Sequence, residues 1–513
     1  VEETTKGGLI LTGSAKEKPQ VAQVVAVGPG GVVDGKEVKM TVKVGDNRSF
    51  RTVLQEDAAQ LSEVVVVGYG QQKKVNLTGS VSSVDVAEQS KSRPFTDLSQ
   101  ALSGAAAGLN VMSTSSQPNS ENSSILIRGI GTLNNSAPLI LVDGMEMSLS
   151  DVNPNDVASI SVLKDAAACS IYGNRGANGV ILVTTKKGAE GAPVLSYSGY
   201  VGFQNPTRIT DQVNSYEYAL MKNEAAMNAG YPNYYAYSQH DLEMYRKTVE
   251  GAPDADPDRY PNSNGLRDLI RHNTAITSHN LSLSGGTQRV NYYVSLGYLY
   301  QQGMWRTTDY QRFNLQSNIS VKATSTTTVD LNLGGWHQNK KYPGVSAGDI
   351  MYQAYRTPPV SAIKYTNGLW GQYVGKSLYG MAFHSGYDKQ PSSQLNATLS
   401  ITQQLPFVKG LSIKGVVSYD PYRSKSKNWL TPMPVYTLDA STDPYTWTEG
   451  FQGPEKPYLS VSYSEDATFT YQGMINYNNS FGPHQVTALA VIEARDKHCW
   501  NLGARRNNYG ILV

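Results

Sequence analysis

The 513-residue sequence lacks features that mark several common classes of protein. It has almost no charge imbalance, because 44 lysines and arginines stand against 42 aspartates and glutamates, and this excludes the basic surface that nucleic-acid binding requires. It has no run of 18 apolar residues, so a membrane-spanning helix is excluded, and any membrane crossing would have to use strands. Charged residues make up only 17%, below the roughly 25% of ordinary soluble domains.

Motifs that carry chemistry are also absent. The sequence has no GxSxG, HExxH, CxxC or phosphate-loop pattern, and its seven histidines are scattered. Cys169 and Cys499 lie far apart, so we expect free thiols. His498 and Cys499 are adjacent, but the sequence places no further metal ligands beside them. We therefore predict a protein that is not an enzyme and that has no metal site and no cofactor.

The most distinctive stretch is residues 125–187. Apolar runs at 125–127, 138–144 and 179–186 alternate with Gly and Asn turns and predict a small sheet, to which residues 157–163 add a strand. Residues 165–172 predict a short helix with Asp165 near its start. Residues 96–109 predict a helix with Thr96 as its N-cap. The stretch therefore predicts a compact mixed α/β domain.

Several motifs occur in this stretch in a fixed order, and together they are specific for one protein family. IRGIGT, then PLILVDG, then NPNDVASISVLKDAAACSIYGNRGANGVILVTTKKG resembles the plug of TonB-dependent outer-membrane transporters, and within them the SusC/RagA branch that imports glycans and peptides in Bacteroidota. The resemblance covers residues 53–513 and places the plug at 75–190. It implies a location in the cell outer membrane, surrounded by lipid. It also implies TonB with ExbB and ExbD as energy source, a SusD-like surface lipoprotein as partner, and an oligosaccharide or peptide as substrate.

Residues 47–74 resemble the linker upstream of the plug in that family. Within it, one segment matches the TonB box in position and character: Glu63, Val64, Val65, Val66, Val67, Gly68 and Tyr69. A β-branched run in a flexible segment can add as a strand to the edge of a partner's sheet. An ordinary buried strand is the alternative for the four valines.

Five charged residues of the predicted plug lie within otherwise apolar or Gly-rich sequence: Arg128, Asp143, Lys164, Asp165 and Arg175. One interpretation is a polar network that transmits the pull of TonB through the plug. The other is a set of solvated turn charges.

From residue 191 the pattern changes to period two. Leu395, Ala397, Leu399 and Ile401 alternate with neutral polar residues, and similar runs occupy 195–203, 313–322 and 469–477. Runs near ten residues with one apolar face predict the wall of a transmembrane β-barrel, since strands of a soluble sandwich are about half as long. About ten such strands fit, against roughly 22 in plugged transporters. The predicted fold is mainly β: an incomplete, N-terminal part of a barrel at 191–513, preceded by the mixed α/β plug.

Short turns, such as Gly285-Gly286 and Lys409-Gly410, would face the periplasm, and insertions at 205–274 and 340–391 would face outward. Both insertions are rich in aromatic residues, which either stack on sugar rings of a substrate or pack together and order the loops. The candidates are Tyr234, Tyr235, Tyr355, Trp370 and Tyr373. Loop sequences do not encode the identity of a substrate.

Residues 1–46 differ from the rest and resemble the co-chaperonin GroES from its mobile loop onward. The resemblance implies that Leu9, Ile10 and Leu11 dock on a chaperonin ring. Strands are missing at both ends of the small barrel, so we expect a foreign or chimeric segment rather than a working co-chaperonin. Binding to a chaperonin is nevertheless the alternative function. A third class, a surface adhesin built from β-strands, would lack a plug, so the motifs at 125–187 argue against it. Nothing near Val1 resembles a signal peptide, so we expect the sequence to be incomplete at its start.

Overall fold

The structure is a computed structural model in which the chain divides into two compact units, residues 1–64 and 65–513. It describes residues 31–33, 36–38, 64–67, 70–73, 81–86, 89, 96–113, 117–118, 123–231, 237–482 and 484–507. In the first unit, β1 (Gly31–Val33) and β2 (Lys36–Val38) form an antiparallel pair. Farther along the chain, β3 (Val64–Val67) and β4 (Gly70–Lys73) form a separate two-stranded ribbon.

The predicted plug contains a five-stranded sheet in the order β5-β10-β11-β8-β9. Its strands are β5 (Val81–Val84), β8 (Leu139–Val142), β9 (Met145–Glu146), β10 (Val157–Leu163) and β11 (Val180–Thr185). The central strands β10 and β11 are mostly apolar, and Ile160, Val162, Val180 and Ile181 are completely buried. Such continuous apolar runs are typical of strands that are covered on both faces. The predicted strand at 157–163 is confirmed residue for residue.

Short helices cover the plug sheet, and their caps set their limits. The helix α3 (Ala166–Cys169) begins as predicted at Asp165, whose Oδ1 accepts a hydrogen bond from the backbone N–H of Ala168 at 2.8 Å. The helix predicted at 96–109 is wrong in its extent, because α2 spans only Leu98–Leu102 and its N-cap is Asp97. The chain adopts left-handed backbone at Gly104 and Gly108, with φ of +73° and +76°, which stops the helix.

The apolar run at 125–127 forms the strand β7 (Ser123–Ile127), but not in the main plug sheet. It pairs with β6 (Leu109–Ser113) in a separate ribbon, so the prediction of one small sheet is wrong for this run. Apolar contact joins the ribbon to the sheet, since Ile125 and Ile127 share a buried cluster with Ile160 and Ile181. Burial, not strand pairing, determines where this segment lies.

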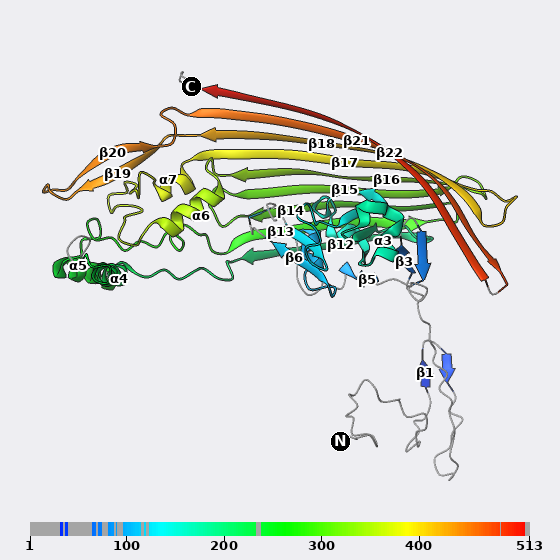
Figure 1. The fold of residues 1–513 in the computed structure, drawn as a ribbon, viewed down its shortest axis with the longest axis horizontal. Helices are drawn as coiled ribbons and strands as arrows, with labels where there is room; N and C mark the ends of the chain where they lie inside the picture. Colours follow the sequence, from blue (N-terminus) through cyan, green and yellow to red (C-terminus); the bar gives the residue numbers. More distant parts are fainter. Residues whose placement is uncertain are drawn as a thin grey trace, which may run out of the picture. The chain divides into compact units, whose positions relative to one another are not determined.

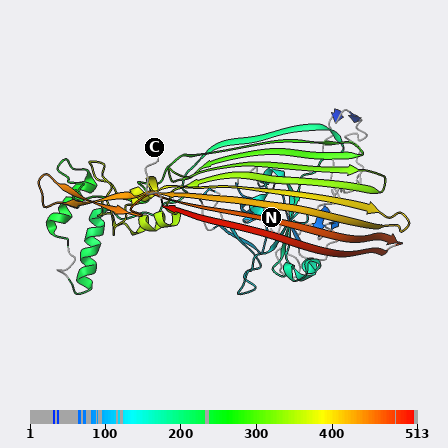
Figure 2. The same cartoon turned by 90° about the horizontal axis from the view of Figure 1, so that it is seen from above.

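The rest of the chain is organised by a nine-stranded antiparallel sheet whose neighbours follow sequence order (Figures 1 and 2). The sheet is barrel-like but open, and among the described residues no pairing joins its edge strands β12 and β22. The strands are 13 to 24 residues long, longer than the predicted ten. They are β12 (Gly191–Gln204), β13 (Thr274–Gly286), β14 (Val290–Gln302), β15 (Asp309–Lys322), β16 (Thr327–Tyr342), β17 (Gly386–Gln404), β18 (Leu411–Leu430), β21 (Tyr458–Phe481) and β22 (His484–Asn507).

Connections at one end of the sheet are short, at 287–289, 323–326 and 405–410, and those at the other end are mostly long. The long insertions carry α4 (Ser215–Asn228), α5 (Gln239–Glu250), α6 (Ala347–Arg356), α7 (Leu378–Phe383), and a hairpin of β19 (Met433–Asp439) and β20 (Thr446–Gln452). All lie beyond the same end of the strands in Figures 1 and 2. The insertion at 431–457, which holds the hairpin, was not predicted. None of the described helices has both the length and the apolar character needed to cross a bilayer.

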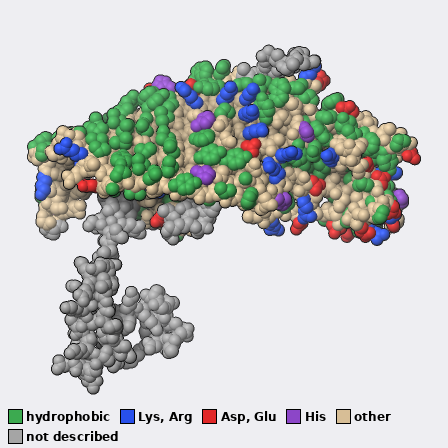
Figure 3. Space-filling model, turned by 180° about the vertical axis from the view of Figure 1, so that it is seen from behind, with side chains coloured by type: hydrophobic (Ala, Val, Ile, Leu, Met, Phe, Trp, Pro, Cys, Tyr) green, Lys and Arg blue, Asp and Glu red, His purple; other side chains and the backbone are tan. Residues whose placement is uncertain are grey.

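The two faces of the large sheet have opposite polarity, as the period-two pattern predicts. On β17, Leu395 and Leu399 are 41% and 44% exposed, whereas Asn396 and Ser400, which follow them directly, are 8% and 5% exposed. Hydrophobic side chains form a broad band on the convex side of the sheet (Figure 3). The sheet therefore exposes its apolar face and buries its polar face, the reverse of a soluble protein.

Candidate functional site

The polar face of the sheet meets the plug mainly along residues 147–156, which we call the plug tongue. Two consecutive 3-10 turns build it, η3 (Leu149–Asp151) and η4 (Pro154–Asp156). Ser148 and Asp151 form a reciprocal capping box on the first turn, and Asn153 caps the second with Pro154 at its first position. The caps leave Asp151 and Asp156 at the ends of the turns, close to the sheet.

Asp156 is buried between plug and sheet with only 2% of its surface exposed. Its Oδ1 accepts hydrogen bonds from the hydroxyls of Tyr293 and Ser295 on β14, at 2.9 and 2.5 Å. These two residues are neighbours on one face of the strand because side chains alternate. Burial raises the pKa of the Asp156 carboxyl, and the two hydroxyls and the charge of Lys186 oppose the rise only in part.

Arg312 on β15 is the buried cation of the interface, with 5% of its surface exposed. Its guanidinium donates to the carbonyl oxygens of Ser150 and Asp151 at 2.5 and 3.0 Å, and lies 5.4 Å from the centre of the Trp336 ring. The Trp336 indole N–H donates to Oδ1 of Asp151 at 3.1 Å. Burial also raises the pKa of Asp151, while the Arg312 charge lowers it. Arg312 and Trp336 thus fix the first turn of the plug tongue.

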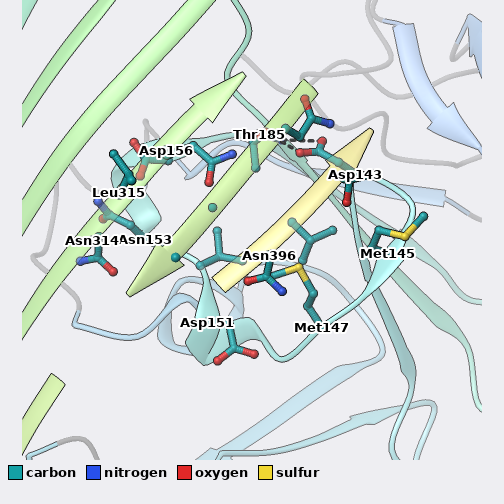
Figure 4. A pocket seen from close by; sticks show the side chains of 17 residues that line it. Asp143, Met145, Met147, Asp151, Asn153, Asp156, Thr185, Asn314, Leu315 and Asn396 are labelled. Carbon is teal, nitrogen blue, oxygen red and sulfur yellow. Dashed lines mark hydrogen bonds between the residues drawn. The ribbon is translucent and has the colours of Figure 1, made fainter. Parts of the chain in front are cut away.

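A third connection involves Asp143, one of the predicted plug charges. Asp143 has a left-handed backbone with φ of +48°, and its carboxylate accepts hydrogen bonds from the backbone and hydroxyl of Thr185 at 3.1 and 2.5 Å. Thr185 in turn accepts from Nδ2 of Asn318 on β15 at 2.8 Å. Figure 4 shows Asp143 and Thr185 together beside Asp156. A continuous set of hydrogen bonds therefore runs from the plug to the sheet.

The space enclosed by these groups is small. The cavity in Figure 4 has a volume of about 40 Å³ and is lined by carboxylates of the plug and amides of the sheet. A polar cavity of this size holds on the order of three water molecules. Sugar rings and peptides do not fit into this cavity.

Two larger clefts lie along the polar face of the sheet. One, of about 530 Å³, separates plug residues near Glu146 from β17, β18, β21 and β22. The other, of about 430 Å³, continues toward the long insertions and is lined by hydroxyls and amides, among them Ser392, Ser424, Ser464 and Asn501. Tyr422 lines both clefts. Their volumes are in the range of ligand sites.

The other predicted plug charges have separate partners. Lys164 donates to Ser82 Oγ and to the carbonyl of Ala107, and burial lowers its pKa, with the charge of Arg128 acting in the same direction. Asp165 caps α3. Within the described chain, no ion pair joins two of the five predicted residues. The structure does not gather them into one network, and a role in transmitting force stays a prediction.

Arg175 connects the plug to the large sheet through ion pairs. It forms ion pairs with Glu146 of the plug and with Glu493 of β22, the latter at 3.1 Å. Arg495 of β22 pairs with the same Glu146 at 2.5 Å. These four groups are partly exposed, so each pair contributes roughly 1 kcal/mol or less.

The predicted aromatic residues lie in different environments. The Trp370 ring stacks on His384 with centroids 4.2 Å apart, and it packs against the apolar core of the long insertions. The Tyr373 ring lies 5.8 Å from the Arg356 guanidinium, whereas Tyr355 is 54% exposed. Tyr234 and Tyr235 lie outside the described residues. Trp370 therefore packs within the insertions, and stacking on sugar rings stays a prediction for all five residues.

The segments proposed to bind partner proteins are only partly described. Val64, Val65, Val66 and Val67 form the strand β3, whereas Glu63, Gly68 and Tyr69 lie outside the described residues. Leu9, Ile10 and Leu11 also lie outside them. The roles of both segments stay predictions.

Local sequence patterning did not reveal Asp156, Arg312 and Trp336, the central residues of the interface. One signal was available, since Arg312 is a charged residue at an inward position of an alternating strand, where it needs a buried partner. It also missed the contacts that join the long insertions, such as the hydrogen bond from Tyr445 to Asp256 at 2.5 Å and that from Thr366 to Asp258 at 2.6 Å. These partners are too distant in sequence for local patterns to reveal them.

Replacing Asp156 with Asn tests the pH dependence of this interface. Because the docked carboxyl has a raised pKa, its stabilising effect is complete below the normal aspartate pKa of about 4 and is lost as the pH rises through the raised value. We expect Asp156→Asn to remove that part of the pH dependence. The measurement is the urea concentration at which Cys169, buried in the plug, reacts with a thiol reagent in a Cys499→Ser background. Identical pH profiles for the two proteins would contradict the expectation.

Comparison with known proteins agrees with this architecture. Residues 73–180 match the TonB-dependent Receptor Plug Domain family, and residues 1–56 match the Chaperonin 10 Kd subunit family. TonB-dependent receptor P3 of Formosa agariphila is 31% identical over 88% of this chain and 42% of its own length. TonB-dependent receptor SusC of Bacteroides thetaiotaomicron is 35% identical over 63% of this chain and 31% of its own length. The chain thus spans less than half the length of these relatives.

Solved structures show the same fold. The RagAB peptide transporter is 25% identical with a TM-score of 0.65, over 84% of this chain and 49% of that chain. The RagAB peptide importer in its open-open state is 24% identical with a TM-score of 0.62, over 86% and 53%. At the N-terminus, co-chaperonin GroES of Acetivibrio thermocellus is 84% identical over 45 residues, 9% of this chain and 48% of its own length. The chain therefore carries a TonB-dependent Receptor Plug Domain and is similar to SusC-like TonB-dependent receptors over this plug and the barrel-like sheet, and its N-terminal segment is similar to a co-chaperonin.

Proposed function

We propose that this chain acts in the cell outer membrane as plug and wall of an importer for oligosaccharides or peptides. TonB, with ExbB and ExbD, supplies the energy through residues 63–69, and a SusD-like lipoprotein assists at the surface. The observation that carries the proposal is the reversed polarity of the nine-stranded sheet. An apolar face exposed over a broad band is stable against lipid and costly against water.

The polar face supports transport rather than a solid core. It is lined by hydroxyl and amide groups, and it holds a separately folded plug through hydrogen bonds. A force can separate a polar interface of this kind at low cost, because water replaces each hydrogen bond that is broken between plug and sheet. The two clefts beside the plug supply room for a ligand of oligosaccharide or peptide size.

The choice between oligosaccharide and peptide has support on both sides. The RagAB structures are described as a peptide importer, and RagAB has the same fold as this chain. The hydroxyl- and amide-lined cleft and the aromatic insertions suit the hydroxyls and ring faces of sugars. Both ligand classes therefore belong to the proposal.

Labels on adjacent residues of β17 test the membrane orientation. We expect a nitroxide at Leu399→Cys to contact lipid and a nitroxide at Ser400→Cys to face the interior, because the two side chains lie on opposite faces. In lipid nanodiscs, with Cys169 and Cys499 replaced by Ala and Ser, oxygen should broaden the signal of the first label only. Equal broadening of both labels by a water-soluble nickel complex would contradict the proposal.

The N-terminal segment favours a second candidate function. Its 84% identity to a co-chaperonin over 45 residues suggests a chaperonin-binding role, with Leu9, Ile10 and Leu11 as the docking residues. The similarity covers 48% of that co-chaperonin and 9% of this chain, whereas the receptor similarity covers 88%. Import is therefore the function that explains most of the molecule.

A further inference from the structure

The cleft of about 430 Å³ on the polar face of the large sheet is lined by hydroxyl and amide groups of neighbouring strands, and we call it the wall cleft. One row of these groups crosses it in register from β17 to β22: Ser392, Ser424, Ser464 and Asn501. Ser392 is buried on the same face of β17 as Ser400. The row can donate and accept hydrogen bonds along the length of a bound ligand.

Lys340 of β16 supplies the wall cleft with a positive charge. It is two residues from Gln338 and four from Trp336, both buried on the polar face, so its side chain shares that face. Lys425 also borders the cleft, but it is exposed on the opposite face, since its neighbour Ser424 occupies the polar face. None of the described residues that line the cleft is acidic. The cleft therefore offers a cation to a ligand.

Lys340 is a half-buried charge whose surroundings supply no anion. In the part of the chain that the structure describes, no carboxylate lies within ion-pair distance of its ammonium group. Asp388 borders the cleft, but its two carboxylate oxygens accept hydrogen bonds from the Gln390 amide and the Ser426 hydroxyl, at 2.7 and 3.0 Å. Because a charge withdrawn from water is costly without a partner, a bound anion would stabilise this site.

A second cation nearby increases the need for an anion. Arg312 of β15 lies opposite Gln338, which makes it a diagonal neighbour of Lys340 at roughly 7–8 Å. The charge of Arg312 is offset by the buried carboxylate of Asp151, whereas Lys340 lacks such a partner among the described residues. The like charge of Arg312 therefore makes the unpaired Lys340 less favourable still.

The neighbouring cleft, between the plug and the sheet, differs in this respect. Both cations among its described lining residues have carboxylate partners, since Arg495 pairs with Glu146 at 2.5 Å and Lys497 pairs with Asp466 at 3.6 Å. An anion that entered this cleft would have to displace a carboxylate of the chain. The wall cleft is therefore the better site for a negatively charged ligand.

The rest of the lining favours a sugar over a peptide. Peptide sites commonly provide pockets for side chains, but the polar face of the wall cleft presents no aliphatic side chain, and its Leu502 is 56% exposed on the convex face. Toward the plug, the cleft is bordered by Tyr422, whose ring meets the Trp336 ring edge-on with centroids 6.2 Å apart. Asp151 fixes Trp336 through its indole N–H. Hydroxyl and amide groups beside a fixed aromatic pair suit the hydroxyls and ring faces of sugars.

We propose that the wall cleft binds an acidic oligosaccharide. The carboxylate of a uronic acid contacts the Lys340 ammonium group, and hydroxyls of the adjoining sugars contact Ser424, Ser464 and Asn501. The inference rests on the proposed function and narrows its ligand to one class, because it requires the polar face of the sheet to line the path of the transported ligand.

The test compares a charged ligand with an uncharged one of the same shape. The whole 513-residue chain in lipid nanodiscs is titrated calorimetrically with tetragalacturonic acid and with its methyl ester. Lys340→Gln should bind the acid roughly 10-fold to 100-fold more weakly, because a hydrogen bond to a charged group is lost. It should bind the ester as well as the unaltered chain does. The matched control is Lys341→Gln, which removes an exposed lysine one position away on the opposite face and should keep its affinity for the acid.

The outcomes that would overturn the inference are distinct. No binding of the acid to the unaltered chain, or equal affinities of Lys340→Gln and Lys341→Gln for it, would remove the site. A lower urea midpoint for reaction of Cys169 in Lys340→Gln, in the Cys499→Ser background, would show that Lys340 is already paired within the chain. Equally tight, equally Lys340-dependent binding of tetraglutamate would assign the cleft to acidic peptides instead. Failure of the Leu399 and Ser400 labelling would overturn the proposed function itself.

Discussion

Deletion of residues 63–68 is expected to abolish uptake of the transported ligand while leaving its binding at the cell surface unchanged. Under the proposed function, binding requires the insertions and the plug, whereas import also requires a mechanical link to TonB. In the structure, Val64–Val67 form a strand that belongs to a two-stranded ribbon and not to the plug sheet. A short strand with one described partner can add to the sheet edge of another protein, and its main-chain hydrogen bonds then supply the affinity.

A pair of substitutions at Val66 makes this test independent of the deletion. Val66→Pro removes one main-chain donor and is expected to reduce uptake strongly, whereas Val66→Thr keeps the β-branched shape and is expected to change it little. Uptake of a labelled ligand and its binding to whole cells are measured for each variant. Normal uptake by the proline variant would show that strand addition at this segment is not the link to TonB.

Replacement of Arg312 with Ala is expected to cause the largest loss of stability of any single change at the interface. It leaves two backbone carbonyls of the plug tongue without their donor and leaves Asp151 buried without its cation. A buried acceptor that loses its donor typically costs about 1–3 kcal/mol, and here two acceptors lose theirs. The urea concentration at which the Cys169 thiol reacts, in the Cys499→Ser background, reports the loss.

Two controls define what the Arg312 result means. Arg312→Lys keeps the charge but has no planar fork for two carbonyls, so it should recover only part of the stability. Arg423→Ala removes an exposed arginine on the convex face whose ion pair with Glu465 is worth about 1 kcal/mol or less. Equal urea midpoints for Arg312→Ala and Arg423→Ala would refute the assignment of Arg312 as the main cation of the interface.

Much of the local structure follows from the sequence because its causes are local. The strand at 157–163 and the start of α3 at Asp165 are fixed by an apolar run and by a capping side chain within a few residues. The alternation at 395–402 fixes which face of β17 is apolar, since a strand offers only two faces. The resemblance of the motifs at 125–187 to a known family then predicted that these local elements form a plug and a barrel wall.

The helix at 96–109 and the single plug sheet were wrong for reasons that are only partly local. Propensity favoured a helix through Gly104 and Gly108, but both adopt left-handed backbone that lets the chain turn into β6. The apolar run at 125–127 was correctly predicted as a strand, because its side chains favour extended backbone. Its partner was set by burial against Ile160 and Ile181, which lie in a different sheet.

The sequence by itself determined the strands, their two faces and the plug turns, because each depends on neighbours within about ten residues. Only the tertiary structure decided that Asp156 meets Tyr293 and that Arg312 meets Ser150, since these partners are 137 and 162 residues apart. Strand register, which no single strand encodes, also places Lys341, Lys389 and Lys427 side by side. Long-range pairing must satisfy every buried polar group at once, and that condition can be read only from the assembled fold.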